Sequence, residues 1–301
     1  MIRISTQMIT ERSLSAMLRQ QSDLSNTQLQ LSSGRRVLTP ADDPASAVRV
    51  LGLNGAVETV SQYQNNIDRL TSRLETEEGA LDGITNLLQR VRELTVQGNN
   101  DVLSATDKGA IALEVRQLRD QLFSMANAKD SNGEYIFSGY QTGTPPFNAG
   151  DYIYYGDNGQ RELQIAPGRT IADGDNGFDV FMNVASTAPP ATPRRSVFET
   201  LDNLALALEA NTSVGDYITD VDLALQRVIE TKASVGGRLN AIEEQKTVNE
   251  DLKLNLETQR SDEQDLDYTS AIARFEAQMT ALQAAQQAFV KVKGLSLFNY
   301  L

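Results

Sequence analysis

The eight prolines of this 301-residue chain are clustered, so the strongest helix breakers lie in one part of the sequence. Six of them fall between positions 145 and 193, and residues 47–144 and 194–301 contain none. A proline inside a helix removes a hydrogen bond and clashes with the preceding turn, so only the proline-free stretches can form long helices. The distribution predicts a helical arm, an irregular or β-rich insert, and a second helical arm.

A heptad repeat runs along residues 53–94. One of its inward positions holds Leu53, Val60, Ile67, Leu74, Leu81 and Leu88, and the other holds Ala56, Tyr63, Leu70, Glu77, Ile84 and Val91. Six consecutive heptads with one charged exception are typical of helices packed side by side. At about 1.5 Å per residue they predict a rod roughly 60 Å long. Glu77 is expected to meet an arginine such as Arg73 or a partner helix, whereas Glu75 and Glu78 belong to a solvated face.

Three further helices are predicted to complete this rod. Residues 107–128 follow a turn at Asn99–Asp101 and should fold back on the first helix as a hairpin, and residues 197–210 form a short helix. Residues 217–260 repeat an apolar position every seven residues, although Asn249 interrupts the repeat and Gly236–Gly237 is expected to weaken or kink the helix. The apolar positions are Val221, Val228, Val235 and Ile242.

The two ends of the chain are predicted to be amphipathic helices over residues 7–33 and 266–293. Their apolar positions, which we interpret as an assembly interface, are Leu14, Met17, Leu24, Leu31, Tyr268, Ile272, Phe275, Met279, Leu282 and Phe289. Neither arm buries its apolar stripe alone, so each needs a helical partner. We expect both arms to be largely disordered or loosely helical until neighbouring subunits cover them. Residues 1–40 carry five arginines and two acids, so this arm is basic, while residues 197–257 carry five basic and twelve acidic residues.

The insert changes from helical to strand-like periodicity. Four aromatic or β-branched runs, at residues 135–137, 152–155, 162–165 and 178–181, predict a small antiparallel β domain. The tetrapeptide Gly-Asp-Asn-Gly occurs at 156–159 and 174–177 and favours hairpin turns. The expected division is a terminal domain of residues 1–40 and 262–301, a rod domain of 41–128 and 197–261, and a β-rich domain of 129–196. The predicted fold class is thus mainly α with a β insert, an antiparallel helical rod built from both chain ends.

The composition argues against most catalytic and ligand-binding functions. The chain has no Cys, Trp or His, which removes thiol nucleophiles, the usual zinc ligands and the side chain that titrates near neutrality. We expect no catalytic residue, no cofactor and no metal site. Residues 173–179 resemble a calcium loop but lack its glycine and glutamate, so a hairpin turn is favoured there. Asp42 and Asp43 precede Pro44 in the order typical of helix initiation.

The net charge and hydropathy of the chain limit its partners and its location. A net charge of −13 argues against binding to nucleic acid or to an anionic membrane. The sequence has no apolar run long enough to span a bilayer. Its first residues, MIRISTQMITERS, lack the apolar core of a cleaved signal peptide.

The string LSSGRRVLTPADDPASAVR at 31–49 strongly resembles the N-terminal region of the bacterial flagellin family. The resemblance continues through GALDGITNLLQRVRELTVQGNN at 79–100 and through the C-terminal arm, which ends in LSLFNYL, so that it covers about two-thirds of the chain. In the insert, NGEYIFSGY at 132–140 and YGDNGQRELQIAPGR from 155 are similar to the branch of this family found at the junction of hook and filament.

This resemblance implies a structural subunit that joins the flagellar hook to the filament by self-assembly through its terminal helices. It implies a ring of identical subunits, another hook-associated protein and flagellin as neighbours, and an export chaperone at the C-terminal helix. The protein would be exported uncleaved by the flagellar type III apparatus to the extracellular flagellum. Three alternatives remain open: flagellin itself, a coiled-coil secreted effector or adhesin, and an enzyme acting through the insert.

Overall fold

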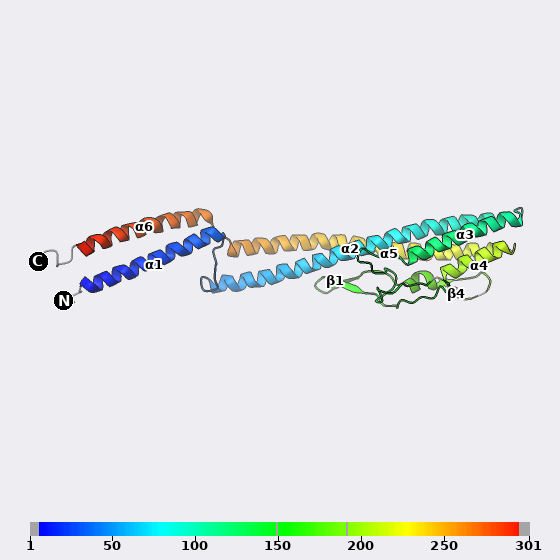
Figure 1. The fold of residues 1–301 in the computed structure, drawn as a ribbon, viewed down its shortest axis with the longest axis horizontal. Coiled ribbons are helices and arrows are strands. Elements are labelled where there is room, and N and C mark those ends of the chain that lie inside the picture. The colour runs from blue at the N-terminus through cyan, green and yellow to red at the C-terminus, as the bar shows by residue number, and fades with distance from the viewer. Residues whose placement is uncertain (1–5, 149, 191, 295–301) are drawn as a thin grey trace. The chain divides into compact units, whose positions relative to one another are not determined.

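The computed structural model describes residues 6–148, 150–190 and 192–294, which divide into two compact units. The terminal unit combines the chain ends, Met1–Thr59 and Leu252–Leu301, and the central unit is Val60–Asp251. Helices α2 (Pro44–Gly98) and α5 (Gly215–Gln264) contribute residues to both units (Figure 1). Six α-helices and two short two-stranded sheets in the described residues confirm the predicted fold class, mainly α with a small β insert.

In the terminal unit, α1 (Thr6–Ser33) packs along α6 (Tyr268–Gly294). The helices are antiparallel, because the Gly34 carbonyl at the end of α1 accepts a hydrogen bond from the Leu266 amide just before α6. Both arms are therefore helical in the structure. Each arm takes the other as its helical partner, so part of each apolar stripe is covered within the chain.

Residues 34–43 form the connection between α1 and α2. Gly34 has φ +69°, a conformation that favours glycine because it has no Cβ, and this residue ends α1. Asp42 accepts hydrogen bonds from the Leu38 and Thr39 amides, and Asp43 accepts one from the Ser46 amide at the first turn of α2. The predicted helix-initiating role is confirmed for Asp43, whereas Asp42 instead closes the turn that precedes α2.

The central unit packs α3 (Ala105–Ala126) and α4 (Val197–Glu209) with α2 and α5 around one hydrophobic core. Ser104 and Asp107 form a capping box that starts α3. The Arg90–Glu114 ion pair joins α3 to α2, so the predicted hairpin is confirmed. Helix α5 runs without interruption through Gly236–Gly237, where we expected a weakness or kink. The seam positions that lie buried in this core are Ile67, Leu74, Leu81, Leu88, Val221, Val228, Val235 and Ile242. Val60 is buried outside this core, and Leu53 is half-buried in the terminal unit.

The insert contains less β-structure than we predicted. Strand β1 (Glu162–Ala166) pairs with β2 (Arg169–Ala172), as the run at 162–165 predicted, and β3 (Val184–Ala185) pairs with β4 (Arg194–Arg195). The other three predicted strands are wrong: residues 135–137 and 152–155 form only isolated bridges, and 178–181 lie in a π-helical turn, η1 (Phe178–Met182).

The physical reason for this difference is aromatic packing. The side chains of Phe137, Phe147, Phe181 and Phe198 form one buried cluster with edge-to-face contacts, for example 5.2 Å between the ring centroids of Phe137 and Phe181. Residues that look strand-forming are used here to fill a core against α4. The Gly-Asp-Asn-Gly segments also do not form the predicted hairpins, since the observed β1–β2 turn is at Pro167–Gly168, where Gly168 has φ +72°.

Within residues 6–148, 150–190 and 192–294, we find no helix apolar enough over sufficient length to cross a lipid bilayer.

Candidate assembly surface

The ten predicted assembly residues fall into two sets on the α1–α6 pair. Six of them repeat every seven residues along the contact between the helices and are half-buried there: Met17, Leu24, Leu31, Phe275, Leu282 and Phe289. The other four are exposed on the outside of the pair: Leu14, Tyr268, Ile272 and Met279. The structure therefore brings the first set together and leaves the second set without a covering surface in the described chain.

The terminal unit has almost no hydrophobic core of its own. Of the buried hydrophobic residues in the described chain, it contains only Val37, Val50, Val57, Leu266 and Ala271. It contains twelve of the 22 exposed large hydrophobic residues: Met8, Leu14, Leu18, Leu29, Val48, Leu51, Leu252, Leu254, Tyr268, Ile272, Met279 and Val290. Exposed apolar area at this density is typical of surfaces that bind another protein.

The contact between α1 and α6 is also partly polar. Gln20 and Gln278 lie in it, and the side-chain oxygen of each is buried without a hydrogen-bond partner. A buried amide oxygen left unpaired destabilises a structure by about 1–3 kcal/mol. Each unpaired oxygen therefore weakens the contact between the two helices.

A cluster of charged side chains, which we call the polar junction, holds the turn between α1 and α2 against the end of α5. It consists of Arg36, Asp43, Ser46, Arg49 and Glu263. Arg36 pairs with Asp43 at 3.1 Å and donates to the Glu263 backbone carbonyl, while the Glu263 carboxylate accepts from Arg49 at 2.8 Å and from the Ser46 hydroxyl at 3.0 Å. Hydrogen bonds from Ser46 and the nearby Arg36 lower the pKa of Asp43 to about 2. The flagellin-like string at 31–49 supplies four of these five residues.

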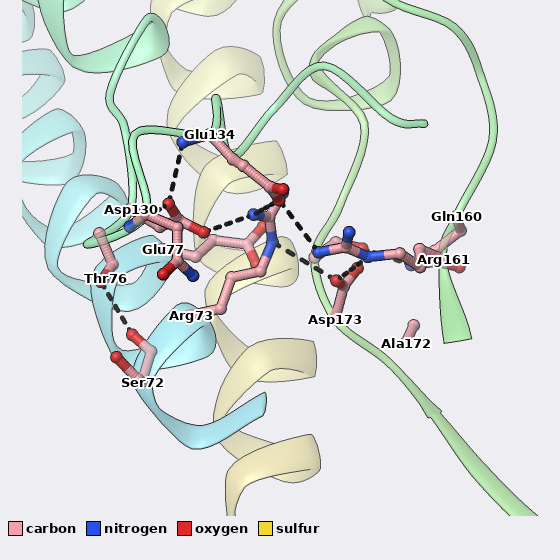
Figure 2. A network of polar contacts seen from close by, with 12 residues as sticks. Ser72, Arg73, Thr76, Glu77, Asp130, Glu134, Gln160, Arg161, Ala172 and Asp173 are labelled. Carbon is pink, nitrogen blue, oxygen red and sulfur yellow. Dashed lines mark hydrogen bonds and ion pairs between the residues drawn. The ribbon is translucent and has the colours of Figure 1, made fainter. Parts of the chain in front are cut away.

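The insert is fastened to α2 by a buried arginine, which we call the Arg73 anchor (Figure 2). Arg73 pairs with Asp130 at 2.8 Å and with Glu134 at 3.3 Å, and it donates to the Tyr135 carbonyl at 3.1 Å. Asp173 lies 3.6 Å from the Arg73 Nε atom and also pairs with Arg161. Asp173, the first residue of the segment compared with a calcium loop, is thus neutralised by two arginines.

Glu77 lies one turn after Arg73 and is completely buried. Its Oε1 atom accepts a hydrogen bond of 3.0 Å from the Asp175 amide, and Asp175 is paired with Arg238 of α5. Burial, and then the negative charge of Asp175, raise the pKa of Glu77 to about 8. The charged exception in the heptad repeat therefore meets the insert's backbone, and no ion pair joins it to Arg73 in the described residues.

Two more polar side chains that break the apolar pattern also hold the insert. Asn249 of α5 donates to the Ile165 carbonyl of β1 at 2.9 Å. Asp220 accepts hydrogen bonds from the Ser186 hydroxyl and the Thr187 amide, each at 2.6 Å. Sequence reasoning noticed Asn249 as an interruption but did not predict either contact, because their partners are backbone groups distant in sequence.

The charged side chains around the Arg73 anchor are engaged with one another. A cleft of ≈ 420 Å³ beside the Arg73 anchor is lined by charged groups, but Arg73, Asp130, Glu134, Arg161 and Asp173 are paired with one another. In the part of the chain that the structure describes, we find no group of three or more His, Cys, Asp or Glu side chains placed to bind a metal. What the geometry provides is a folded central unit and a terminal unit with uncovered apolar faces.

Comparison with known proteins assigns this architecture to a class. Residues 4–142 match the model of the bacterial flagellin N-terminal helical region. A putative flagellar hook-associated protein from Vibrio parahaemolyticus has the same fold, with a TM-score of 0.67 at 24% identity over 74% of this chain and 100% of that one. The flagellar junction protein FlgL of Legionella pneumophila superimposes with a TM-score of 0.56 at 22% identity, over 63% of this chain and 97% of that one. The chain is a flagellin-type helical protein.

Relatives that match over their full length define the family more narrowly. The chain is 33% identical to flagellar hook-associated protein 3 of Escherichia coli (strain K12) and 30% identical to that of Salmonella typhimurium, each over 99% of both chains. A flagellin from Clostridium tyrobutyricum is 35% identical over only 38% of this chain. The chain belongs to the family of flagellar hook-associated protein 3.

Proposed function

We propose that this protein is a structural subunit of the bacterial flagellum that joins the hook to the filament, and that it is not an enzyme. The single observation that carries this proposal is the terminal unit, in which large hydrophobic side chains remain exposed on α1, α2 and α6 while few are buried. A subunit that covers these faces only in contact with neighbours gains stability on assembly. Full-length similarity to a hook-associated protein supports the location.

Within this proposal the ten predicted assembly residues of α1 and α6 contact neighbouring subunits, and the rod residues of α2 and α5 keep the central unit folded. Residues 1–40 and 262–301 act as the assembly domain, 41–128 and 197–261 as the rod domain, and 129–196 as the outer domain. The neighbours are further copies of this chain in a ring, another hook-associated protein on one side and flagellin on the other. The chain leaves the cell uncleaved through the type III apparatus, with an export chaperone on its C-terminal helix.

A genetic experiment tests the proposal. Cells that lack this gene but keep intact flagellin genes are expected to carry hooks without filaments and to release flagellin into the medium. The full chain restores filaments, and a chain that lacks residues 1–40 and 262–301 does not. Filaments in the deletion strain, or joining by the truncated chain, would contradict the proposal.

The nearest alternative is flagellin, which shares the N-terminal region. Flagellin polymerises in bulk, so that role predicts that deletion removes most filament mass and that the purified chain forms long filaments. The match to hook-associated protein 3 favours the junction role, because it combines 33% identity with 99% of the chain, whereas a flagellin is 35% identical over only 38% of the chain and another only 26% identical over 78%. No particular contact in the structure favours an effector, an adhesin or an enzyme.

A further inference from the structure

One helix in the central unit carries a strip of carboxylates that nothing in the described chain neutralises. Glu243, Glu244, Glu250 and Asp251 are all exposed on α5, and none forms an ion pair with a described residue. The lysine within this stretch, Lys246, is directed to Asp68 of α2 at 3.7 Å. We call these four residues the acidic strip.

The acidic strip contrasts with the rest of α5 in the central unit. Earlier along the helix, Asp222 pairs with Arg92, Lys232 with Asp82, and Arg238 with Asp175. In the strip, Glu243 and Glu250, like Glu244 and Asp251, are seven residues apart, so their negative charges lie about 10.5 Å apart along the same side of the helix and repel one another weakly. Exposed Val248 lies among them. A partner that brings positive charge and some apolar surface would relieve this repulsion.

A complementary surface lies on α1. Arg12 and Arg19 are exposed, form no ion pair with a described residue, and are the only charged residues between positions 12 and 22. Leu14 and Leu18 are exposed beside them. Glu11 and Asp23 lie outside this interval, so the segment between them is purely basic.

The two surfaces also match in spacing. Arg12 and Arg19 are seven residues apart, as are Glu243 and Glu250. Positions seven apart lie on nearly the same face of a helix and are separated by about 10.5 Å along its axis. Two helices that pack side by side, whether parallel or antiparallel, can therefore place Arg12 and Arg19 opposite Glu243 and Glu250 at the same time.

We propose that Arg12 and Arg19 of α1 in one copy of the chain bind the acidic strip on α5 of a second copy. The two halves of the contact lie on different surfaces, so the interface is heterologous, and its repetition generates a ring or a helix of subunits. The inference rests on the proposed function, because it names the contact through which neighbouring subunits meet. Charge pairs at such an interface also select the register of the neighbour.

The absence of cysteine in the chain allows a clean cross-linking test. Cells that produce two forms, Arg19→Cys and Glu250→Cys, are grown, and their isolated flagella are oxidised. A disulfide-linked dimer of the two forms is expected, with at least tenfold less dimer from the matched pair Arg19→Cys and Glu75→Cys, since Glu75 lies exposed on α2 away from the strip. If the protein is present in flagella but no dimer exceeds the control, this inference is wrong and the proposed function stands. If the protein is absent from flagella, the proposed function itself fails.

Charge reversal tests the same contact without cysteines. The double variant Arg12→Glu/Arg19→Glu is expected to reduce the amount of this protein in isolated flagella about tenfold, and Glu243→Arg/Glu250→Arg to do the same. Combining the four substitutions is expected to restore the amount of this protein in isolated flagella, because the reversed charges again attract each other. A combined variant as defective as either double variant would overturn the inference. A chain with both Arg19→Cys and Glu250→Cys that forms an internal disulfide as a dilute monomer would also overturn it, since α1 would then bind its own α5.

Discussion

Single polar residues within apolar patterns explain how the insert is held in place. Glu77, Asn249 and Asp220 are all buried, and each binds backbone groups of the insert. A buried polar group is destabilising unless it is hydrogen-bonded, so each fixes one position of the insert.

Glu77 makes the stability of the protein depend on pH. Its pKa is about 8 in the folded chain, above the ordinary value of 4.5, so the folded state favours the protonated carboxyl. The stabilisation is complete below about pH 4.5 and is lost as the pH rises through about 8. We expect the free energy of unfolding to fall over this window by about 1 kcal/mol per pH unit from this group.

The variant Glu77→Gln isolates that contribution, because the amide oxygen can still accept the hydrogen bond from Asp175 but does not titrate. Urea unfolding at pH 5 to 9 should show a declining free energy of unfolding for the native chain and a flatter curve for the variant. Parallel curves would show that Glu77 does not control this pH dependence.

Arg73 is predicted to be the most sensitive charged residue of the central unit. Replacing it by Met leaves the carboxylate of Asp130 without an ion-pair partner and Asp173 with Arg161 alone, which we expect to lower the free energy of unfolding by about 3–5 kcal/mol. Arg92→Met is the matched control, since its ion pair with Asp222 is exposed and should matter by less than about 1 kcal/mol. Hydrogen exchange should quicken at residues 128–135 in the first variant. An equal loss of stability in the two variants would contradict the claim that Arg73 fastens the insert to α2.

At the scale of the helices, the α1–α6 pair is predicted to be weakened by its glutamines. Gln278→Leu removes a buried amide oxygen that has no partner and adds apolar contact along the seam. We expect the arms to melt at a higher temperature, with a gain of about 1 kcal/mol, as followed by circular dichroism. Gln283→Leu, at a fully exposed position of α6, serves as the control. A lower melting temperature for Gln278→Leu would show that its amide makes a needed interaction.

Gly52 and Gly55 are among the glycines of α2 that the fold of the isolated chain does not require. A Cβ at Gly52 or Gly55 would lie in open space, with no atom within 4 Å. Substituting both by Ala should stabilise the helix by about 1 kcal/mol per site, measured by urea unfolding. A destabilised double variant would contradict the observed exposure of this helix face.

The long helices were predictable from the sequence, and the insert was not. Helix α4 spans Val197–Glu209 against an expected 197–210, whereas α2 spans Pro44–Gly98 and so extends beyond the heptad repeat of 53–94 at both ends. Periodicity reports which face of an element is buried but not which distant segment buries it. Residues 178–181 have the composition of a strand, yet they form a π-helical turn because Phe181 packs on Phe137 and Phe198.

The assembly residues show the same limit. Seven-residue spacing identified Met17, Leu24 and Phe275 as apolar positions of the arms, but it could not separate the positions used within the α1–α6 pair from those left exposed. That distinction depends on the helix that each arm contacts. The exposed set, which includes Ile272 and Met279, is the part that the proposed neighbours must cover.

For the whole molecule, two observations converge on one role. The terminal unit exposes apolar faces, and the chain is similar over its full length to flagellar hook-associated protein 3. A junction protein and a filament subunit would both assemble through their terminal helices. They differ in where they lie on the flagellum, so the location of the protein distinguishes the two roles.

Immunogold electron microscopy of intact flagella, with an antibody against the insert at residues 129–196, tests this claim most directly. We predict label at one position on each flagellum, where the curved hook meets the filament. Label distributed along the filament, or no label on flagella that contain the protein's neighbours, would contradict it.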